Sequence, residues 1–369
     1  MVGNGARGPE QGGGRLRLRG KRDYDEDDVR VRPGRSSRPR TRQRPRHADA
    51  VPAFVTTVDR GRYTCFLADE GRSVVAMRAR ELGRRGVVVG DRVQLVGDIT
   101  GDAGSLARIV RIEERESVLT RTADDVEDSV EGRLERVVVA NADQMVIVNA
   151  LSDPPPRTGF IDRCLVAAYD AEIDPLLCLT KADLAGPDKL LDYYAELDLP
   201  YVLCRPDQPL DALLATLSGR LSVLVGHSGV GKSTLVNRLV PDAYRSVGVV
   251  SAVGKGRHTS SSAIALPLPG ETGWIVDTPG VRSFGLAHVT EDSLLHGFPD
   301  LVEASTRCPP NCDHTGASGV CGLDQLVAEG GADPRRLASY RRLLALRAGD
   351  DPNRFKEDVP VPGENDPGE

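Results

Sequence analysis

The chain has 369 residues, of which 40% are apolar, enough to supply the cores of two or three domains. No run of eighteen apolar residues occurs, which excludes a membrane-spanning helix. The Gly- and Arg-rich start also lacks the apolar stretch of a secretory signal. We therefore expect a cytoplasmic protein without membrane contact. The net charge of −6 is unevenly spread, because residues 1–46 carry fourteen Lys or Arg and six Asp or Glu, a balance of +8 that leaves −14 for the rest.

The first 49 residues lack apolar periodicity, so we predict a disordered basic arm over residues 1–49. A basic, Gly/Pro-rich segment on an acidic body is typical of a flexible tail attracted to polyanions such as RNA. The same composition also fits a solvated tail produced by Arg-rich codon usage. Both interpretations stay open.

Residues 50–115 have the pattern of a small β-barrel. Polar turn signals such as Asp59–Gly61 separate five short β-rich runs, which are Ala53–Val58, Tyr63–Leu67, Ser73–Arg78, Arg92–Val96 and Ser105–Ile112. Five strands in so short a segment fit a barrel such as the oligonucleotide-binding (OB) fold. The pattern does not separate this barrel from an SH3-like one, and it does not identify a ligand.

Residues 116–285 are predicted to form an α/β domain. The polar stretch 115–133 looks like a linker, after which strands and helices alternate. The predicted strands are Met145–Leu151, Pro175–Leu179, Pro200–Cys204, Leu221–Val225 and Trp274–Val276. The predicted helices are Phe160–Tyr169, Asp188–Leu197 and Leu210–Leu217. This alternation is typical of a mostly parallel sheet covered by helices.

A phosphate-binding loop is the clearest motif of this domain. Residues 226–234 fit G-x-x-x-x-G-K-[ST], follow the apolar strand and precede a predicted helix at Ser233–Leu239. Backbone amides of such a loop point at phosphates, while Lys232 is suited to hold the β- and γ-phosphates and Ser233 to bind Mg²⁺. The predicted nucleotide-binding residues are Gly226, His227, Ser228, Gly229, Val230, Gly231, Lys232, Ser233 and Thr234.

A guanine-reading motif lies earlier in the chain, at Thr180, Lys181, Ala182 and Asp183. These residues match [NT]-K-x-D and follow the predicted strand Pro175–Leu179. The Asp183 carboxylate can accept hydrogen bonds from the N1–H and exocyclic amine of guanine, whereas adenine would leave it unpaired. Thr180 replaces the commoner Asn and offers a single hydroxyl for contact with the phosphate loop. Together the two motifs predict GTP rather than ATP.

Two later segments match the switch regions of GTPases. Residues 277–280 read D-T-P-G, where Asp277 would be a second Mg²⁺ ligand and Gly280 the amide that senses the γ-phosphate. Between them and the phosphate loop lies Gly254–Ser260, whose Thr259 would close over Mg²⁺ and the γ-phosphate. Taken alone, this segment also reads as a polar surface loop.

The motifs occur in a permuted order, since ordinary GTPases place the guanine motif last. The permutation joins the second switch directly to the segment that follows, so switch motion could move that segment. Val281 stands where many GTPases have a Gln that orients the attacking water, so unaided hydrolysis should be slow. His258 could replace that Gln or could be an ordinary loop histidine. The predicted catalytic residues are Lys232, Thr259, Gly280 and His258.

A metal site is predicted in residues 286–348, a helical domain that ends in the helix Pro334–Arg347. Three of the seven cysteines gather beside a histidine, in the set Cys308, Cys312, His314 and Cys321. Three thiolates and one imidazole suit a closed, tetrahedral, structural Zn²⁺ site. Residues 349–369 are acidic and Pro-rich, and we predict a disordered tail.

The succession of barrel, permuted G domain and Cys₃His segment resembles the small ribosomal subunit biogenesis GTPases, the RsgA/YjeQ family. The resemblance covers about residues 50–348 and includes the phrase Ala140–Gln144, which looks like that family's start of the G domain. It implies a fold in which an OB-type barrel that binds RNA precedes a P-loop GTPase domain and a zinc-binding helical domain follows. It further implies Mg²⁺-dependent GTP hydrolysis stimulated by the small ribosomal subunit, with that subunit and its rRNA as partners. We expect a monomer.

Two other functions stay open at this point. The chain could be an RNA-binding assembly scaffold whose nucleotide is structural and turned over slowly, which the valine at 281 would allow. It could also be a permuted GTPase with another client, such as the large ribosomal subunit.

Overall fold

The computed structural model describes residues 47–82, 86–121, 136–241, 263–278, 286, 289–316 and 321–347. The acidic tail and nearly all of the basic arm predicted from the sequence lie outside these residues. Within the described part of the chain, no helix has the length and apolar character needed to cross a membrane.

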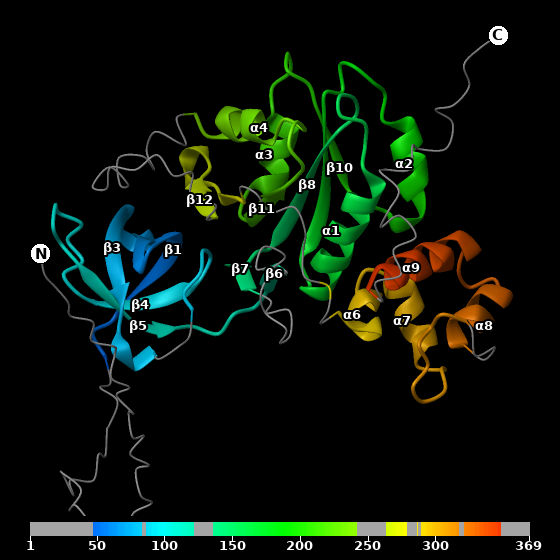
Figure 1. Ribbon diagram of the computed structural model, residues 1–369, viewed down its shortest axis with the longest axis horizontal. Helices are drawn as coiled ribbons and strands as arrows, with labels where there is room; N and C mark the ends of the chain where they lie inside the picture. The colour runs from blue at the N-terminus through cyan, green and yellow to red at the C-terminus, as the bar shows by residue number, and fades with distance from the viewer. Residues whose placement is uncertain are drawn as a thin grey trace, which may run out of the picture. The chain divides into compact units, whose positions relative to one another are not determined.

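Five strands form a closed barrel (Figure 1): β1 (Val51–Asp59), β2 (Arg62–Leu67), β3 (Arg72–Arg78), β4 (Arg92–Gly97) and β5 (Ala107–Ile112). Strand β1 pairs with both β2 and β4, and the ring closes through β3–β5 and β5–β4. Only β3–β5 is parallel. Alternate residues such as Val55, Cys65 and Ile109 fill the interior. This closure is that of an OB-type barrel, which confirms the predicted barrel and decides against the SH3-like alternative.

A two-stranded ribbon follows the barrel, where the sequence predicted only a polar linker. Strand β6 (Val118–Arg121) pairs antiparallel with β7 (Arg136–Ala140). The linker prediction was wrong for the start of residues 115–133, because Leu119 of β6 is buried against the core of the next domain. A run of only four residues in a polar context carries too weak a pattern to be recognised alone.

The α/β domain is built on five parallel strands in the order β10-β9-β8-β11-β13. They are β8 (Gln144–Ala150), β9 (Asp174–Thr180), β10 (Tyr201–Cys204), β11 (Leu221–Val225) and β13 (Trp274–Asp277). Strand β12 (Ile264–Pro267), which the sequence did not reveal, runs antiparallel to β13. The predicted mostly parallel sheet is confirmed.

Helices cover both faces of this sheet (Figure 1). They are α1 (Thr158–Asp170), α2 (Asp188–Tyr194) with the short 3₁₀ turn η4 (Ala195–Leu197), α3 (Asp211–Leu217) and α4 (Lys232–Leu239). In β8, Met145 and Ile147 face the core that contains α1 and α2, whereas Val146 and Val148 face the core that contains α3 and α4. Strand residues that are buried on both faces explain why these strands are continuous apolar runs.

The barrel meets the α/β domain at strands β12 and β13. Thr57 of β1 pairs with Ile264 of β12, and the Phe54 and Phe66 rings each lie 5.1 Å from the Trp274 ring. The barrel also packs closely against the end of β7, where a Cβ at Gly90 would lie 1.9 Å from the Ala140 carbonyl oxygen.

The phrase Ala140–Gln144 has a structural role at this junction. Asn141, with φ of 55°, donates through Nδ2 to the Gly90 carbonyl at 2.8 Å and accepts at Oδ1 from the Glu116 amide at 2.9 Å. The Asp143 carboxylate accepts from the Leu221 amide at 2.7 Å. The phrase therefore fastens the barrel to the first strand of the sheet and to the strand that leads to the phosphate loop.

The C-terminal helices are α6 (Glu291–Leu295), α7 (Pro299–Ser305), α8 (Gly322–Ala328) and α9 (Pro334–Arg347), the last with the bounds expected from the sequence. Helix α9 contacts α1 and η4 of the α/β domain, and the two regions share one apolar core. Arg342 of α9 lies over the Tyr193 ring at 4.5 Å and 3.5 Å from the Asp162 carboxylate. The helical segment is thus packed onto the face of the sheet that α1 covers.

Candidate functional site

The predicted phosphate loop connects the carboxyl end of β11 to the start of α4. Gly229 and Gly231 have φ of 87° and 89°, values that side-chain-bearing residues rarely adopt. A Cβ at Gly226 would lie 2.7 Å from the Val148 carbonyl oxygen of the neighbouring strand. The glycines are therefore required by the backbone path. That path ends at a helix N-terminus, where amides are available to an anion.

Lys232 and Asp277 come together beside this loop. Leu224 of β11 is in register with Asp277 at the end of β13, which brings the carboxylate next to the first residue of α4. The Lys232 ammonium and the Asp277 carboxylate form an ion pair, with side chains 12% and 6% exposed. Thr278 follows and donates to the Leu224 carbonyl at 2.8 Å, which holds the end of β13 against β11. The exposed Ser233 is the next residue of the helix.

These groups fit a magnesium–nucleotide pair. A phosphate would accept from Lys232 and from the loop amides, while Mg²⁺ would take the hydroxyl oxygen of Ser233 and the carboxylate of Asp277. In the structure Lys232 and Asp277 pair with each other. The positive charge of the lysine suits a phosphate, and the negative charge of the carboxylate suits Mg²⁺. The oxygen ligands are the kind that Mg²⁺ prefers.

The predicted guanine motif lies at the same edge of the sheet, because β9 and β11 are parallel and flank β8. Thr180 ends β9 and is buried, and its Oγ1 donates to the Val230 carbonyl of the phosphate loop at 2.5 Å. The Asn149 carbonyl lies 3.3 Å from the same oxygen. The single hydroxyl of Thr180 thus makes the contact with the phosphate loop that the sequence suggested.

The residues after Thr180 turn away from the strand. Lys181 has φ of 53°, and its ammonium donates to the Asp153 carbonyl, a contact that the sequence pattern did not suggest. The Ala182 amide donates to the Cys204 carbonyl at 3.4 Å. Asp183 is exposed and is available to a ligand.

The other predicted residues of the nucleotide site lie outside the described residues. These are His258 and Thr259 of Gly254–Ser260, together with Gly280 and Val281. Their roles stay predictions.

The Cys/His cluster brings four ligand atoms together. The donor atoms of Cys308, Cys312, His314 and Cys321 all lie within 4.8 Å of one another. The Cys308 sulfur is 3.5 Å from Nδ1 of His314 and 3.9 Å from the Cys321 sulfur. Bond lengths of about 2.3 Å to sulfur and 2.0 Å to nitrogen place tetrahedral ligands roughly 3.5–3.8 Å apart, so the set fits Zn²⁺.

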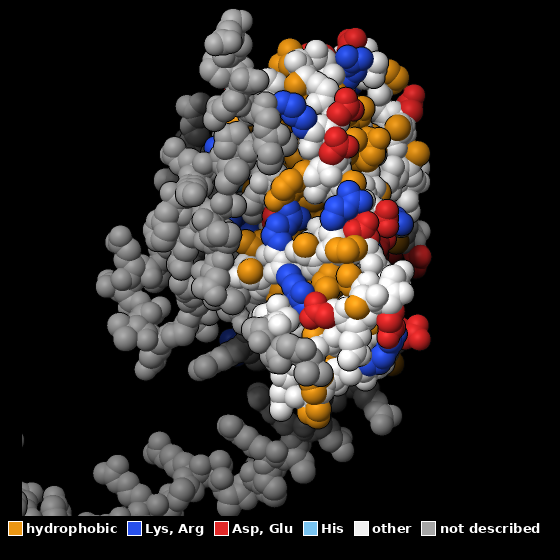
Figure 2. Space-filling model, turned by 90° about the vertical axis from the view of Figure 1, so that its right-hand side faces the viewer, with side chains coloured by type: hydrophobic (Ala, Val, Ile, Leu, Met, Phe, Trp, Pro, Cys, Tyr) orange, Lys and Arg blue, Asp and Glu red, His pale blue; other side chains and the backbone are white. Residues whose placement is uncertain are grey.

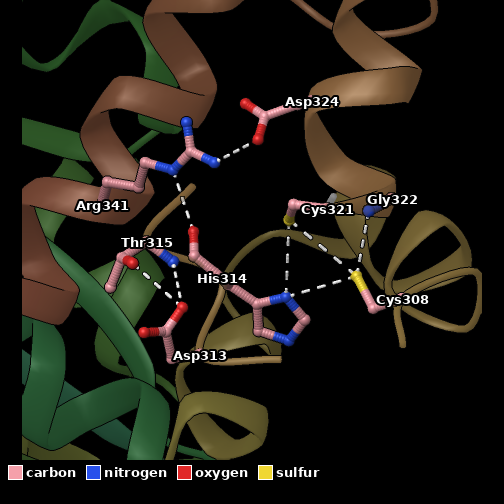
Figure 3. A network of polar contacts seen from close by, with 8 residues as sticks. All are labelled: Cys308, Asp313, His314, Thr315, Cys321, Gly322, Asp324 and Arg341. Carbon is pink, nitrogen blue, oxygen red and sulfur yellow. Dashed lines mark hydrogen bonds and ion pairs between the residues drawn. The ribbon is translucent and has the colours of Figure 1, made fainter. Parts of the chain in front are cut away.

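Neighbouring groups orient these ligands (Figure 3). The Gly322 amide donates to the Cys308 sulfur at 3.1 Å. Arg341 of α9 donates to the His314 carbonyl at 2.9 Å and to the Asp324 carboxylate at 2.8 Å. The hydrogen bond that Asp324 accepts from Arg341, together with the positive charge of Arg341, holds the pKa of Asp324 below its usual value. Arg341 was not singled out from the sequence, since it lies far beyond the last cysteine and outside any ligand spacing.

Comparison with known proteins agrees with this architecture. Residues 112–287 match the family model described as RsgA GTPase. The small ribosomal subunit biogenesis GTPase RsgA of Pseudomonas aeruginosa is 43% identical over 218 residues, which cover 56% of this chain and 63% of that protein. The chain thus spans less than two thirds of that relative's length. The proteins of the same name from Chlorobaculum parvum and Nitrosospira multiformis are 35% and 34% identical, with 89% and 93% of their lengths covered.

Solved structures show the same fold. The crystal structure of YjeQ from Thermotoga maritima aligns with a TM-score of 0.60 at 24% identity, over 81% of this chain and 99% of that one. The structure of YloQ, described as a circularly permuted GTPase, aligns with a TM-score of 0.58 at 21% identity, over 83% of this chain and 98% of that one. With its order of barrel, permuted motifs and Cys₃His cluster, this chain belongs to the family of the small ribosomal subunit biogenesis GTPases RsgA.

Proposed function

We propose that this protein binds Mg²⁺–GTP, hydrolyses it to GDP and phosphate, and uses the cycle in late maturation of the small ribosomal subunit and in its own release from that subunit. The observation that carries the proposal is the hydrogen bond from Thr180 to Val230, which joins a guanine motif to a phosphate loop. A site of this composition discriminates for guanine while it holds phosphates. The family's name supports the ribosomal role.

Each residue of the site has a proposed task. Lys232 and the loop amides would hold the phosphates, and Asp183 would accept hydrogen bonds from the guanine edge. Ser233, Asp277 and Thr259 would hold Mg²⁺, which neutralises charge that develops on the phosphate oxygens. Positioning and charge stabilisation supply most of the catalysis in phosphoryl transfer.

The zinc cluster is proposed to be structural. Its four protein ligands would fill a tetrahedral site, which leaves no position for a substrate. Through Arg341 the cluster is connected to α9, and α9 packs on the α/β domain. A bound ion would therefore stabilise the C-terminal helical segment, which follows the second switch in the sequence.

The rRNA partner is supported by the OB-type barrel and by the family. Surface charge adds little on the described part of the face in Figure 2, where basic and acidic side chains are interspersed rather than gathered by sign. We further propose that the protein acts in the cytoplasm as a monomer.

The deciding experiment is GTP turnover by the purified protein with and without purified small ribosomal subunits. We expect slow turnover alone and stimulation of roughly 10²-fold or more, equivalent to about 2.7 kcal/mol of transition-state stabilisation. Lys232→Ala should lack activity under both conditions. Tight binding to small subunits with no stimulated turnover would instead support the scaffold function, and stimulation by large subunits alone would identify a different client.

A further inference from the structure

Two cysteines without a role in the proposed function lie side by side on the two strands next to the guanine motif. The sulfur atoms of Cys178 in β9 and Cys204 in β10 are 3.5 Å apart, and both side chains are buried. Val202 is in register with Cys178, and Cys204 with Thr180, so the two cysteines are diagonal neighbours, two residues apart in register, on adjacent parallel strands. Both belong to the core on one face of the sheet, whereas Cys164 of α1 lies in the core on the opposite face.

The pair is connected directly to the proposed nucleotide site. Cys178 precedes by two residues Thr180, whose hydroxyl holds the phosphate loop. The Cys204 carbonyl accepts from the amide of Ala182, inside the guanine motif. A change in the distance between the two cysteines would therefore reach residues that are proposed to read the base.

The two buried thiols differ in their surroundings and in the direction of their pKa shifts. A hydrogen bond from Cys178 and the positive charge of Arg238 lower the pKa of Cys204, although burial opposes them. The same hydrogen bond, together with burial, raises the pKa of Cys178 well above its usual value. Arg238 is held in place by the Arg205 and Gln208 carbonyls. Cys204 also ends the strand at the edge of the sheet. Cys204 is therefore expected to be the thiol that more readily forms a thiolate.

We propose that Cys178 and Cys204 form a reversible disulfide on exposure to hydrogen peroxide, and that this disulfide weakens guanine-nucleotide binding. The Cys204 thiolate attacks one peroxide oxygen, so that an S–O bond forms, the O–O bond breaks and hydroxide leaves. Cys178 then attacks the resulting sulfenic acid, its S–H proton leaves with the hydroxyl group as water, and the S–S bond forms. Two thiols lose two electrons in total, and peroxide is reduced to two waters.

The bond has a geometric consequence. The sulfurs must approach by about 1.5 Å to reach the S–S distance of a disulfide. Cys204 is the last residue of the four-residue edge strand, so we expect Cys204 to move rather than Cys178. The Cys204 carbonyl, which accepts the hydrogen bond from the Ala182 amide, would move with it. We expect GTP affinity to fall about tenfold, the change that corresponds to roughly one lost hydrogen bond at a ligand. This second half of the proposal rests on the proposed function.

The disulfide itself is tested by peptide mapping of the full-length, zinc-loaded protein after peroxide treatment and blocking of free thiols. Trypsin should release peptides 164–181 and 190–220 linked to each other and two mass units lighter than their sum. The linked pair should vanish in Cys178→Ala and persist in Cys164→Ala, the matched control within the same peptide. Zinc content is measured on the same samples, so that oxidation of the Cys/His cluster is distinguished from oxidation of Cys178 and Cys204. Absence of the linked pair from oxidised wild-type protein would overturn the proposal.

The effect on nucleotide binding is measured as the Kd of a fluorescent GTP analogue. Wild-type protein and Cys164→Ala should bind about tenfold more weakly after oxidation and recover with dithiothreitol, whereas Cys178→Ala should bind equally before and after. Equal affinity of the linked and reduced wild-type forms would refute the regulatory half, as would loss of affinity in oxidised Cys178→Ala. Failure of the reduced wild-type protein to bind GTP would instead contradict the proposed function, and the peptide map would still decide the disulfide.

Discussion

Thr180 is the residue at which the two halves of the proposed nucleotide site touch. Its hydroxyl is buried and donates to the Val230 carbonyl. Thr180→Val keeps the shape but leaves that carbonyl unpaired, which should cost about 1–3 kcal/mol. We expect a lower free energy of unfolding and weaker GTP binding, measured by denaturant titration and calorimetry. Thr180→Ser retains the hydroxyl and is the control. If Val and Ser behaved alike, the hydrogen bond would have no part in the site.

Asp183, also considered at the residue scale, is the side chain proposed to discriminate for guanine. Asp183→Asn presents an amide donor where guanine's N1–H needs an acceptor. GTP affinity should therefore fall by roughly 10²-fold, or about 2.7 kcal/mol, while xanthine nucleotides gain in relative affinity. Competition binding with GTP, XTP and ATP measures both effects. Unchanged affinity and selectivity would remove Asp183 from the guanine site.

At the scale of elements, the proposed zinc cluster joins the loop after α7 to the start of α8 and, through Arg341, to α9. We expect one zinc per chain, and the double variant Cys312→Ala/Cys321→Ala should lose it in metal analysis. That variant would contradict the assignment if it kept a full equivalent. Loss of zinc should also lower the thermal stability, because the ion cross-links segments whose own helices are short.

Arg341 offers a finer test of the same elements. It donates to the carbonyl of His314, a proposed zinc ligand, and removal of such partners typically weakens metal binding 10–100-fold. Arg341→Ala should show this loss in competition with a chelator. Arg335→Ala is the matched control on the same helix, because the Arg335 side chain is 75% exposed and forms ion pairs with Glu196 and Asp333, away from the cluster. Equal zinc affinity of the two variants would mean that Arg341 has no influence on the ligands.

At the scale of the whole molecule, the prediction concerns the ribosome-stimulated reaction. Because Val281 is predicted to stand at the water-orienting position, we expect docking on rRNA to bring His258 towards the γ-phosphate. His258→Ala should then leave GTP binding nearly intact but abolish the roughly 10²-fold stimulation. Lys232→Ala should impair both binding and turnover. Full stimulated turnover in His258→Ala would show that the water is positioned by backbone groups or by the ribosome.

The sequence by itself determined the class of fold and the family. Continuous apolar strands that alternate with helices already specify a parallel sheet covered on both faces, and alternating short strands specify a barrel. The glycines around Lys232 and the spacing of the Cys/His set are local patterns, because the curvature of a loop and the geometry of a metal site are determined by residues that lie close together in the sequence. For this reason the bounds of β11 and α9 followed from the sequence alone.

Only the tertiary structure decided what depends on contacts between distant residues. Closure of the barrel through β3–β5, the antiparallel β12 beside β1 and the β6–β7 ribbon all require pairing partners that no short window of sequence contains. The same holds for the ion pair of Lys232 with Asp277, for Arg341 at the metal cluster and for the adjacent sulfurs of Cys178 and Cys204. Local periodicity reports which face of an element is buried, but the partner against which it is buried is set by the packing of the whole chain.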